Sequence, residues 1–141
     1  MAKAREMKIL ICLDYSSFTE SVLEHIKKFV QELNAASITV FHVIDEQLFY
    51  ATTGYEVALN EEMQNESKLL KELCVQYLGS SMHYIEEYGI PKLEIDAAIK
   101  HAKHDLIIAG SHSRHGLGER LVGSIAEHIL RNSKTPVLII R

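Results

Sequence analysis

The stretch from Asp105 to Arg141, DLIIAGSHSRHGLGERLVGSIAEHILRNSKTPVLIIR, has the pattern that decides the fold. It begins with a short continuous apolar run, DLIIAG, which is typical of a strand buried on both faces of a parallel sheet. A loop rich in glycine and serine follows, and then apolar residues recur at helical spacing, at Leu121, Ile125 and Ile129. Pro136 ends this helix, and VLII at 137–140 predicts a last strand. Strand, loop, helix and strand in this order indicate a parallel α/β protein.

The rest of the chain repeats this alternation. Apolar or β-branched runs predict three further strands, at Met7–Asp14, Ser37–Asp45 and Ser81–Tyr88. A capping box at Ser17–Glu20 predicts the start of one helix, and a long helix is expected at about Glu56–Leu78. Pro91 suits the first turn of another helix, with Ala102 among its inward-facing residues. Five strands alternating with four helices predict a three-layer α/β fold in a single domain over residues 1–141.

Composition excludes several classes of protein. The 141 residues are 47% hydrophobic and 24% charged, which is average for a globular protein and excludes a disordered chain. The net charge of −4 argues against a nucleic-acid partner held by a basic surface. No apolar run approaches the length of a membrane span, so we expect no membrane partner. The N-terminus lacks a signal-peptide cleavage site, and Cys12 and Cys74 lie in apolar runs as buried thiols, so we expect a cytoplasmic protein.

A candidate ligand site lies in the loop from Gly110 to Ser124, GSHSRHGLGERLVGS. Glycines let backbone N–H groups approach an anion, and the N-terminus of the following helix adds a favourable dipole. The segment GERLVGS at 118–124 has the glycine spacing of a P-loop but lacks its lysine, and no G-x-G-x-x-G follows the first strand. From the residues alone, a phosphate-binding loop and a flexible turn both remain open.

Two other kinds of site find less support in the sequence. Histidine pairs at 101/104 and 112/115 have a spacing that suits one metal ion, but no Cys cluster or H-E-x-x-H accompanies them. Ser124, His112 and Asp14 are candidates for a hydrolytic triad, yet the nucleophile-elbow sequence G-x-S-x-G is absent. We therefore expect no metal-ligating residues and no catalytic triad.

Three motifs resemble those of one known family. KILICLDYS at 8–16 is similar to the family's first strand and its acidic end, and HVID at His42–Asp45 to the end of its second strand. The family's ATP-binding motif, G-x2-G-x9-G-[ST], is matched by Gly110, Gly123 and Ser124. Over nearly its whole length the chain thus resembles a universal stress protein. The resemblance implies an adenine-nucleotide α-hydrolase-like fold with a five-stranded parallel sheet in the order 3-2-1-4-5.

The resemblance also implies a nucleotide site. Asp14 would lie beside the adenine and ribose, and Val43 would offer backbone contacts to the base. The phosphates would be surrounded by Gly110, Ser113, Gly123 and Ser124, with His112, Arg114 and Ile125 at the same end of the pocket. Mg²⁺ or Mn²⁺ would accompany a triphosphate.

Two departures from the ATP-binding branch bear on the function. Ser113 stands where the motif has its second glycine, and LFYATTGYEVALNEEM at 48–63 resembles the branch that does not bind ATP. The leading hypothesis is a stress-response protein that binds ATP or a related adenine nucleotide as a regulatory ligand. The alternative is a dimeric interaction protein of the same family without a nucleotide. No general base for phosphoryl transfer is evident, so we expect at most slow ATP hydrolysis or autophosphorylation.

The C-terminal strand predicts an oligomer. VLII at 137–140 would form an apolar edge of the sheet, and an uncovered apolar edge promotes aggregation. Because members of the family it resembles commonly dimerise through the last strand, we expect a homodimer.

Overall fold

Five parallel strands form the centre of the computed structural model, which describes residues 5–33, 35–45, 56–111 and 122–141. The strands are β1 (Met7–Cys12), β2 (Ala35–Asp45), β3 (His83–Gly89), β4 (Leu106–Gly110) and β5 (Val137–Ile140). They are ordered β3-β2-β1-β4-β5, and every neighbouring pair is parallel. The predicted fold class and strand order are both confirmed.

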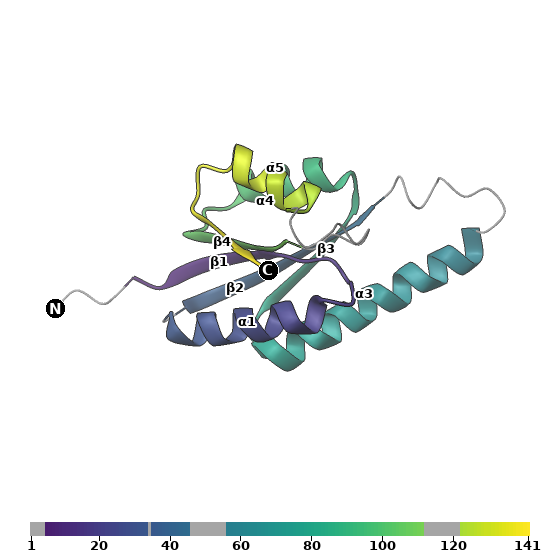
Figure 1. Ribbon diagram of the computed structural model, residues 1–141, viewed down its shortest axis with the longest axis horizontal. Helices are drawn as coiled ribbons and strands as arrows, with labels where there is room; N and C mark the ends of the chain where they lie inside the picture. The colour runs from purple at the N-terminus through teal and green to yellow at the C-terminus, as the bar shows by residue number, and fades with distance from the viewer. Residues whose placement is uncertain (1–4, 34, 46–55, 112–121) are drawn as a thin grey trace.

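Within the part of the chain that the structure describes, four helices cover the sheet, two on each face (Figure 1). On one face lie α1 (Thr19–Glu32) and α3 (Glu56–Leu78), and on the other lie α4 (Pro91–His101) and α5 (Ser124–Asn132). Alternate residues of β1 therefore enter two cores: Ile9 and Ile11 pack toward α1 and α3, whereas Leu10 and Cys12 pack toward α4 and α5. Burial on both faces explains why β1 and β4 appear in the sequence as continuous apolar runs rather than alternating ones.

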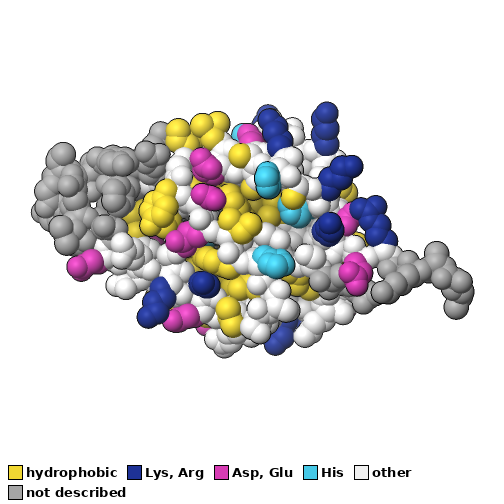
Figure 2. All heavy atoms as spheres, turned by 180° about the vertical axis from the view of Figure 1, so that it is seen from behind, with side chains coloured by type: hydrophobic (Ala, Val, Ile, Leu, Met, Phe, Trp, Pro, Cys, Tyr) yellow, Lys and Arg dark blue, Asp and Glu magenta, His cyan; other side chains and the backbone are white. Residues whose placement is uncertain are grey.

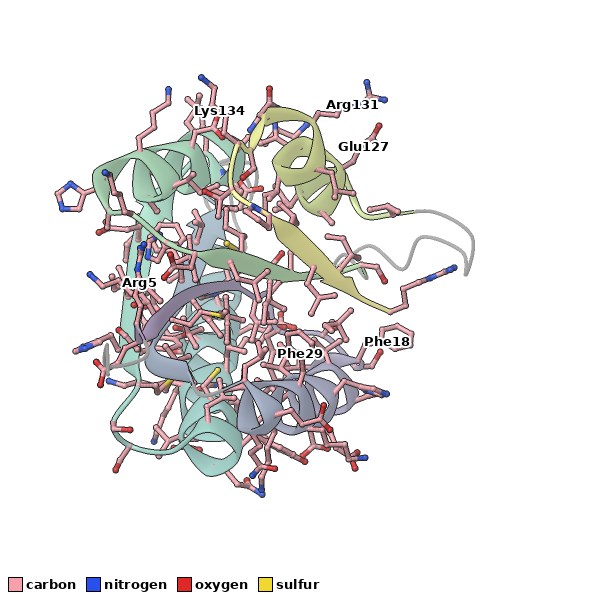
Figure 3. The ribbon with its side chains drawn as sticks, turned by 90° about the vertical axis from the view of Figure 1, so that its left-hand side faces the viewer. Arg5, Phe18, Phe29, Glu127, Arg131 and Lys134 are labelled. Carbon is pink, nitrogen blue, oxygen red and sulfur yellow. The ribbon has the colours of Figure 1, made fainter. Side chains whose placement is uncertain are left out.

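The start of α1 differs from the sequence prediction. The expected capping box began at Ser17, but the helix begins at Thr19, and Phe18 at the N-cap makes no side-chain cap hydrogen bond. Phe18 is 41% exposed and points outward at the start of α1 (Figure 3). The side-chain hydroxyl of Thr19 bonds to the chain that precedes the helix, and these bonds organise the turn in place of a capping box.

The bounds of the five strands and of α3 agree with the prediction within two residues. The last helix was expected to include Leu121, which lies outside the described residues, and α5 ends at Asn132, before Pro136. The helix expected at about Glu56–Leu78 has those bounds. The first strand ends at Cys12, so Asp14 lies beyond it in the connection to α1. Ala102, expected to face inward on α4, is exposed because that helix ends at His101. Cys12 and Cys74 are buried free thiols, as expected.

The surface mixes charges of both signs. Acidic and basic side chains are interspersed on the face shown in Figure 2, with hydrophobic side chains between them. Across the described residues, no helix is both long and apolar enough to cross a membrane. Within the same ranges, no three His, Cys, Asp or Glu side chains are grouped so that they could hold a metal ion.

Candidate functional site

A pocket lies where the carboxyl ends of β1 and β4 meet. The chain leaves β1 for α1 on one face of the sheet and leaves β4 for α5 on the other, so the strand order reverses between these two strands. Such a switch point leaves a crevice between neighbouring strand ends, where parallel α/β proteins bind ligands. The pocket here is lined by Asp14 after β1, Gly110 at the end of β4, and Gly123 before α5. The topology thus joins segments that are far apart in the sequence.

The predicted site residues fall into three groups. Five of them line the pocket together: Asp14, Val43, Gly110, Gly123 and Ile125. Ser124 is the first residue of α5, where it is exposed and outside the lining. His112, Ser113 and Arg114 lie outside the described residues.

The pocket walls are mostly apolar. Val22 of α1, Phe41 and Val43 of β2, Ile95 of α4 and Ala109 of β4 all line it. Val43 is only 6% exposed, so the wall it forms belongs to the protein core. In the lining that the structure describes, Asp14 is the one charged residue. Apolar walls with a single carboxylate suit a flat, largely apolar ring that carries a few hydrogen-bonding groups.

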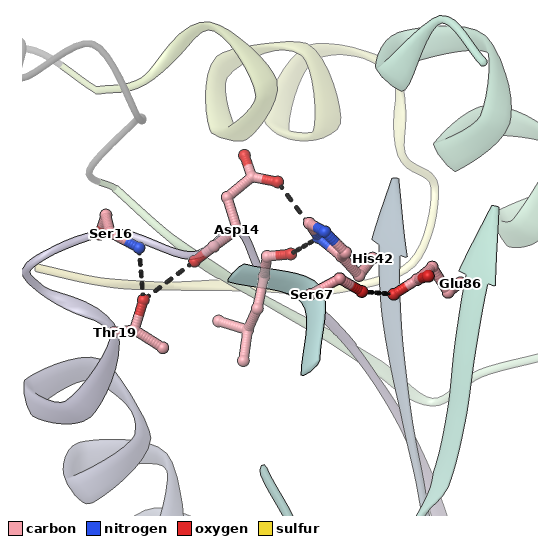
Figure 4. Close-up of polar contacts among 7 residues, drawn as sticks. Asp14, Ser16, Thr19, His42, Ser67 and Glu86 are labelled. Atoms are coloured by element: carbon pink, nitrogen blue, oxygen red, sulfur yellow. Dashed lines mark hydrogen bonds and ion pairs between the residues drawn. The ribbon is translucent and has the colours of Figure 1, made fainter. Parts of the chain in front are cut away.

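The turn that carries Asp14 is held by Thr19, as Figure 4 shows. The Thr19 hydroxyl donates to the main-chain oxygen of Asp14 over 3.1 Å. Its Oγ1 in turn accepts a hydrogen bond from the N–H of Ser16 over 2.7 Å. Thr19 itself is only 3% exposed, so these bonds are shielded from water. The backbone of Asp14 is therefore fixed, while its side chain remains 42% exposed toward the pocket side of the turn.

His42 of β2 lies next to Asp14. Its Nδ1 is 3.0 Å from the main-chain oxygen of Leu13 and 3.6 Å from Oδ1 of Asp14 (Figure 4). Burial of the ring lowers the pKa of His42, but the Asp14 carboxylate and the Leu13 carbonyl act in the opposite direction, with a smaller effect from Glu86. The net result is a pKa of His42 above its ordinary value.

The opposite end of the pocket is formed by the connection into α5. The N–H of Gly123 donates to the carbonyl of Ser111 over 2.7 Å, and the N–H of Ser111 donates to the carbonyl of Ile140 over 2.8 Å. These bonds tie the start of α5 to the ends of β4 and β5. The helix starts without a side-chain cap, and Ile125 and Ala126 of its first turn line the pocket. The N–H groups of a first helical turn and the helix dipole favour an anion at such an end.

Several residues of the pocket were not predicted from the sequence. Phe41, Pro91 and Ile95 form walls, and Thr19 and His42 hold the Asp14 turn. The position of Phe41 is the easiest of these to derive, because residues two apart on a strand share a face and Val43 was already a candidate. Pro91 and Ile95 lie in the first turns of α4. The order of the strands in the sheet brings the start of this helix to the pocket, so the local sequence does not predict that these residues line it.

Comparison with known proteins gives one consistent result. The sequence model of the universal stress protein family matches residues 7–141. Universal stress protein MJ0577 of Methanocaldococcus jannaschii is 32% identical over 156 residues, which cover 95% of this chain and 94% of that protein. A solved structure of MJ0577 superposes with a TM-score of 0.73 at 31% identity, covering 95% of this chain and 94% of that one.

Two more distant structures share the fold and hold a ligand. One is a universal stress protein in complex with cAMP, with a TM-score of 0.56 at 18% identity over 96% of both chains. The other is a universal stress protein from Archaeoglobus fulgidus in complex with dAMP, with a TM-score of 0.53 at 16% identity over 96% of this chain and 98% of that one.

Proposed function

The chain belongs to the universal stress protein family, and we propose that it binds ATP or a related adenine nucleotide as a regulatory ligand in a stress response. The observation that carries the proposal is the pocket at the β1–β4 switch point. It combines apolar walls, one carboxylate at Asp14 and the N-terminus of α5. The adenine nucleotides in two solved structures of the same fold support this ligand class.

The pocket has a part suited to each part of the ligand. The apolar walls at Phe41 and Val43 would hold the adenine ring. The carboxylate of Asp14 accepts hydrogen bonds, so it would receive those of the ribose hydroxyls or the adenine amine. Phosphate oxygens would lie against Gly110 and Gly123, with positive charge supplied by the start of α5.

The remaining predicted residues belong to the phosphate end of this proposal. His112, Ser113 and Arg114 follow β4 directly in the sequence, and Ser124 and Ile125 open α5. Mg²⁺ or Mn²⁺ would enter with a triphosphate, since phosphate oxygens are ligands that these hard cations prefer. We propose that the protein acts in the cytoplasm. We also expect it to bind the nucleotide rather than turn it over rapidly, because the one carboxylate of the described lining, Asp14, would already contact the ribose or the base.

The first experiment asks whether the protein carries a nucleotide. Mass spectrometry of small molecules released by denaturing the purified protein should detect an adenine nucleotide. Calorimetric titration of the stripped protein with ATP should then give saturable binding in the micromolar range. Neither a released nucleotide nor heat at millimolar ATP would refute the proposal and favour an interaction protein without a nucleotide.

A matched pair of variants locates the site. Gly123→Asp introduces a carboxylate at the buried residue that precedes α5, and we expect it to abolish ATP binding. Leu130→Asp introduces the same charge on the same helix at a side chain that is 46% exposed, and we expect it to retain binding. Equal affinities of the two variants would mean that the phosphates bind elsewhere. Circular dichroism of both variants verifies that they are folded.

We further propose that the protein is a homodimer joined through β5. This strand is at one edge of the sheet, and its four apolar residues, Val137–Ile140, are only partly buried in the isolated chain. A second copy would cover this edge. Light scattering at tens of micromolar should give twice the mass of the chain, and a monomer at that concentration would refute the dimer.

A further inference from the structure

His42 lies beside the pocket without lining it. Its neighbours on β2, Phe41 and Val43, line the pocket, whereas the His42 side chain is on the other face of the strand and contacts the turn after β1. The imidazole is 11% exposed, so its contacts with the Leu13 carbonyl and the Asp14 carboxylate are largely shielded from solvent. A charge on this ring acts on Asp14 at short range, although water screens part of the interaction because the Asp14 side chain is 42% exposed.

The hydrogen bond to Leu13 decides which nitrogen titrates. A carbonyl oxygen can only accept, so Nδ1 of His42 must carry a hydrogen to bond the Leu13 oxygen over 3.0 Å. Because Nδ1 keeps that hydrogen in both the neutral and the charged ring, the proton gained or lost is the one on Nε2. Protonation thus adds a positive charge to the ring, whose Nδ1 is 3.6 Å from Oδ1 of Asp14, and leaves the bond to Leu13 intact.

Acidic groups face His42 from both neighbouring strands. Asp14 follows β1, and Glu86 of β3 is the residue paired with His42 in the β2–β3 register. From α3, Ser67 donates a hydrogen bond to Glu86, and Lys68 and Lys71 line the hollow next to that carboxylate. Burial lowers the pKa of His42, but the Asp14 carboxylate, the Leu13 carbonyl and Glu86 together outweigh burial, so the pKa lies above its ordinary value.

We propose that His42 is a positioning residue whose protonation strengthens the binding of anionic nucleotides in the β1–β4 pocket, acting through Asp14. This inference rests on the proposed nucleotide function. Asp14 is the one charged group in the described lining, so with neutral His42 the pocket presents an uncompensated carboxylate to a ligand that carries negative charge. The imidazolium offsets part of the charge of that carboxylate, while its Nδ1–H stays on the Leu13 carbonyl.

Linkage makes the effect reciprocal. If protonated His42 favours the nucleotide, then the bound nucleotide must raise the pKa of His42 by a matching amount. We expect ATP affinity to be roughly fivefold higher near pH 6 than near pH 8, which is the lower end of typical coupling between two sites. The same factor corresponds to a rise of about 0.7 in the pKa of His42 when ATP is bound.

The test compares the protein with its His42→Asn variant. The asparagine amide nitrogen takes the place of Nδ1, so it can still donate to the Leu13 carbonyl, but it carries no charge at any pH. ATP is titrated by calorimetry into both proteins at several values between about pH 6 and pH 8, the range of histidine charging. Because the ligand is the same, its own protonation cancels in the ratio of the two affinities. Adenosine, which has no phosphate, is titrated in parallel.

The expected ratio changes with pH. His42→Asn should bind ATP as the unaltered protein does near pH 8 and about fivefold more weakly near pH 6, whereas adenosine affinity should show little dependence on pH in either protein. ATP binding with the same pH dependence in both proteins would overturn this inference alone. The same is true if adenosine follows the pH dependence of ATP. Failure of ATP to bind at any pH would overturn the proposed function and this inference together.

A second measurement needs no substitution. Imidazole resonances of the unaltered protein, followed by NMR against pH with and without saturating ATP, report the pKa of His42 directly. A rise on binding supports the coupling, and an unchanged or lowered pKa overturns it even where His42→Asn does not fold.

Discussion

Replacement of Gly110 by alanine should separate ligand binding from stability. A Cβ built at Gly110 would lie 3.7 and 3.8 Å from the two methyl groups of Val22, which is ordinary van der Waals contact. The φ angle of Gly110 is outside the left-handed region, so alanine fits the strand without strain. A glycine replaced by alanine at such a position stabilises a protein by about 0.4–1 kcal/mol, because the unfolded chain loses freedom. For a chain of this size, we expect Tm to rise by about 1–4 °C.

The same methyl group should weaken ATP binding. Gly110 and Val22 both line the pocket, so the added carbon occupies space that the backbone leaves for a phosphate. We expect at least a tenfold loss of affinity, about 1.4 kcal/mol, measured by calorimetry and by the smaller increase in Tm when ATP is added.

Gly79→Ala is the matched control: we expect it to lower stability and to leave ATP affinity unchanged, whereas Gly110→Ala should raise stability and weaken binding. Gly79 has a φ of +90°, and nothing lies within 4 Å of a Cβ built there. Alanine should therefore lower the free energy of unfolding by about 1–2 kcal/mol through backbone strain alone, with ATP affinity unchanged. Wild-type affinity in a stable Gly110→Ala variant would refute the reasoning that the phosphates approach this residue. A large loss of stability in that variant would contradict the geometry of β4.

Three further predictions concern stability, each measured by urea denaturation. Thr19→Ala should lower the free energy of unfolding by about 1–2 kcal/mol, because two shielded hydrogen bonds are lost, whereas Thr19→Ser should retain most of it. The pKa of His42 is raised above 6.5 in the folded protein, so protonated His42 stabilises the fold fully below about pH 6.5. This stabilisation is lost as the pH rises through the folded pKa, and the loss should be absent in His42→Asn. Leu70→Ala, at a side chain that is 0% exposed, should cost about 2–5 kcal/mol, against about 0.5 kcal/mol or less for its neighbour Leu69→Ala, which is 44% exposed. Equal costs at these two positions would contradict the orientation of α3.

The local sequence pattern was sufficient to predict most of the helices and strands. The α3 helix over Glu56–Leu78 was predicted with its observed bounds because apolar residues at helical spacing are a property of the segment itself. The predicted start of α1 was wrong. Ser17 has the sequence of a capping box, but Thr19 bonds to the oxygen of Asp14 and to the N–H of Ser16. These side-chain bonds to the backbone of the preceding turn determine where the first turn of the helix begins, and the capping-box pattern does not include them.

The sequence by itself determined the α/β alternation, the family and five residues that line one pocket. These follow from short-range periodicity and from motifs that stay recognisable in any single chain of the family. Only the tertiary structure placed His42 beside the Asp14 carboxylate, because the pairing of β1 with β2 brings these two residues together. It also decided which side chains form the apolar walls, since Pro91 and Ile95 reach the pocket through the order of strands in the sheet. Contacts between segments distant in the chain depend on sheet order and register, which no local pattern encodes.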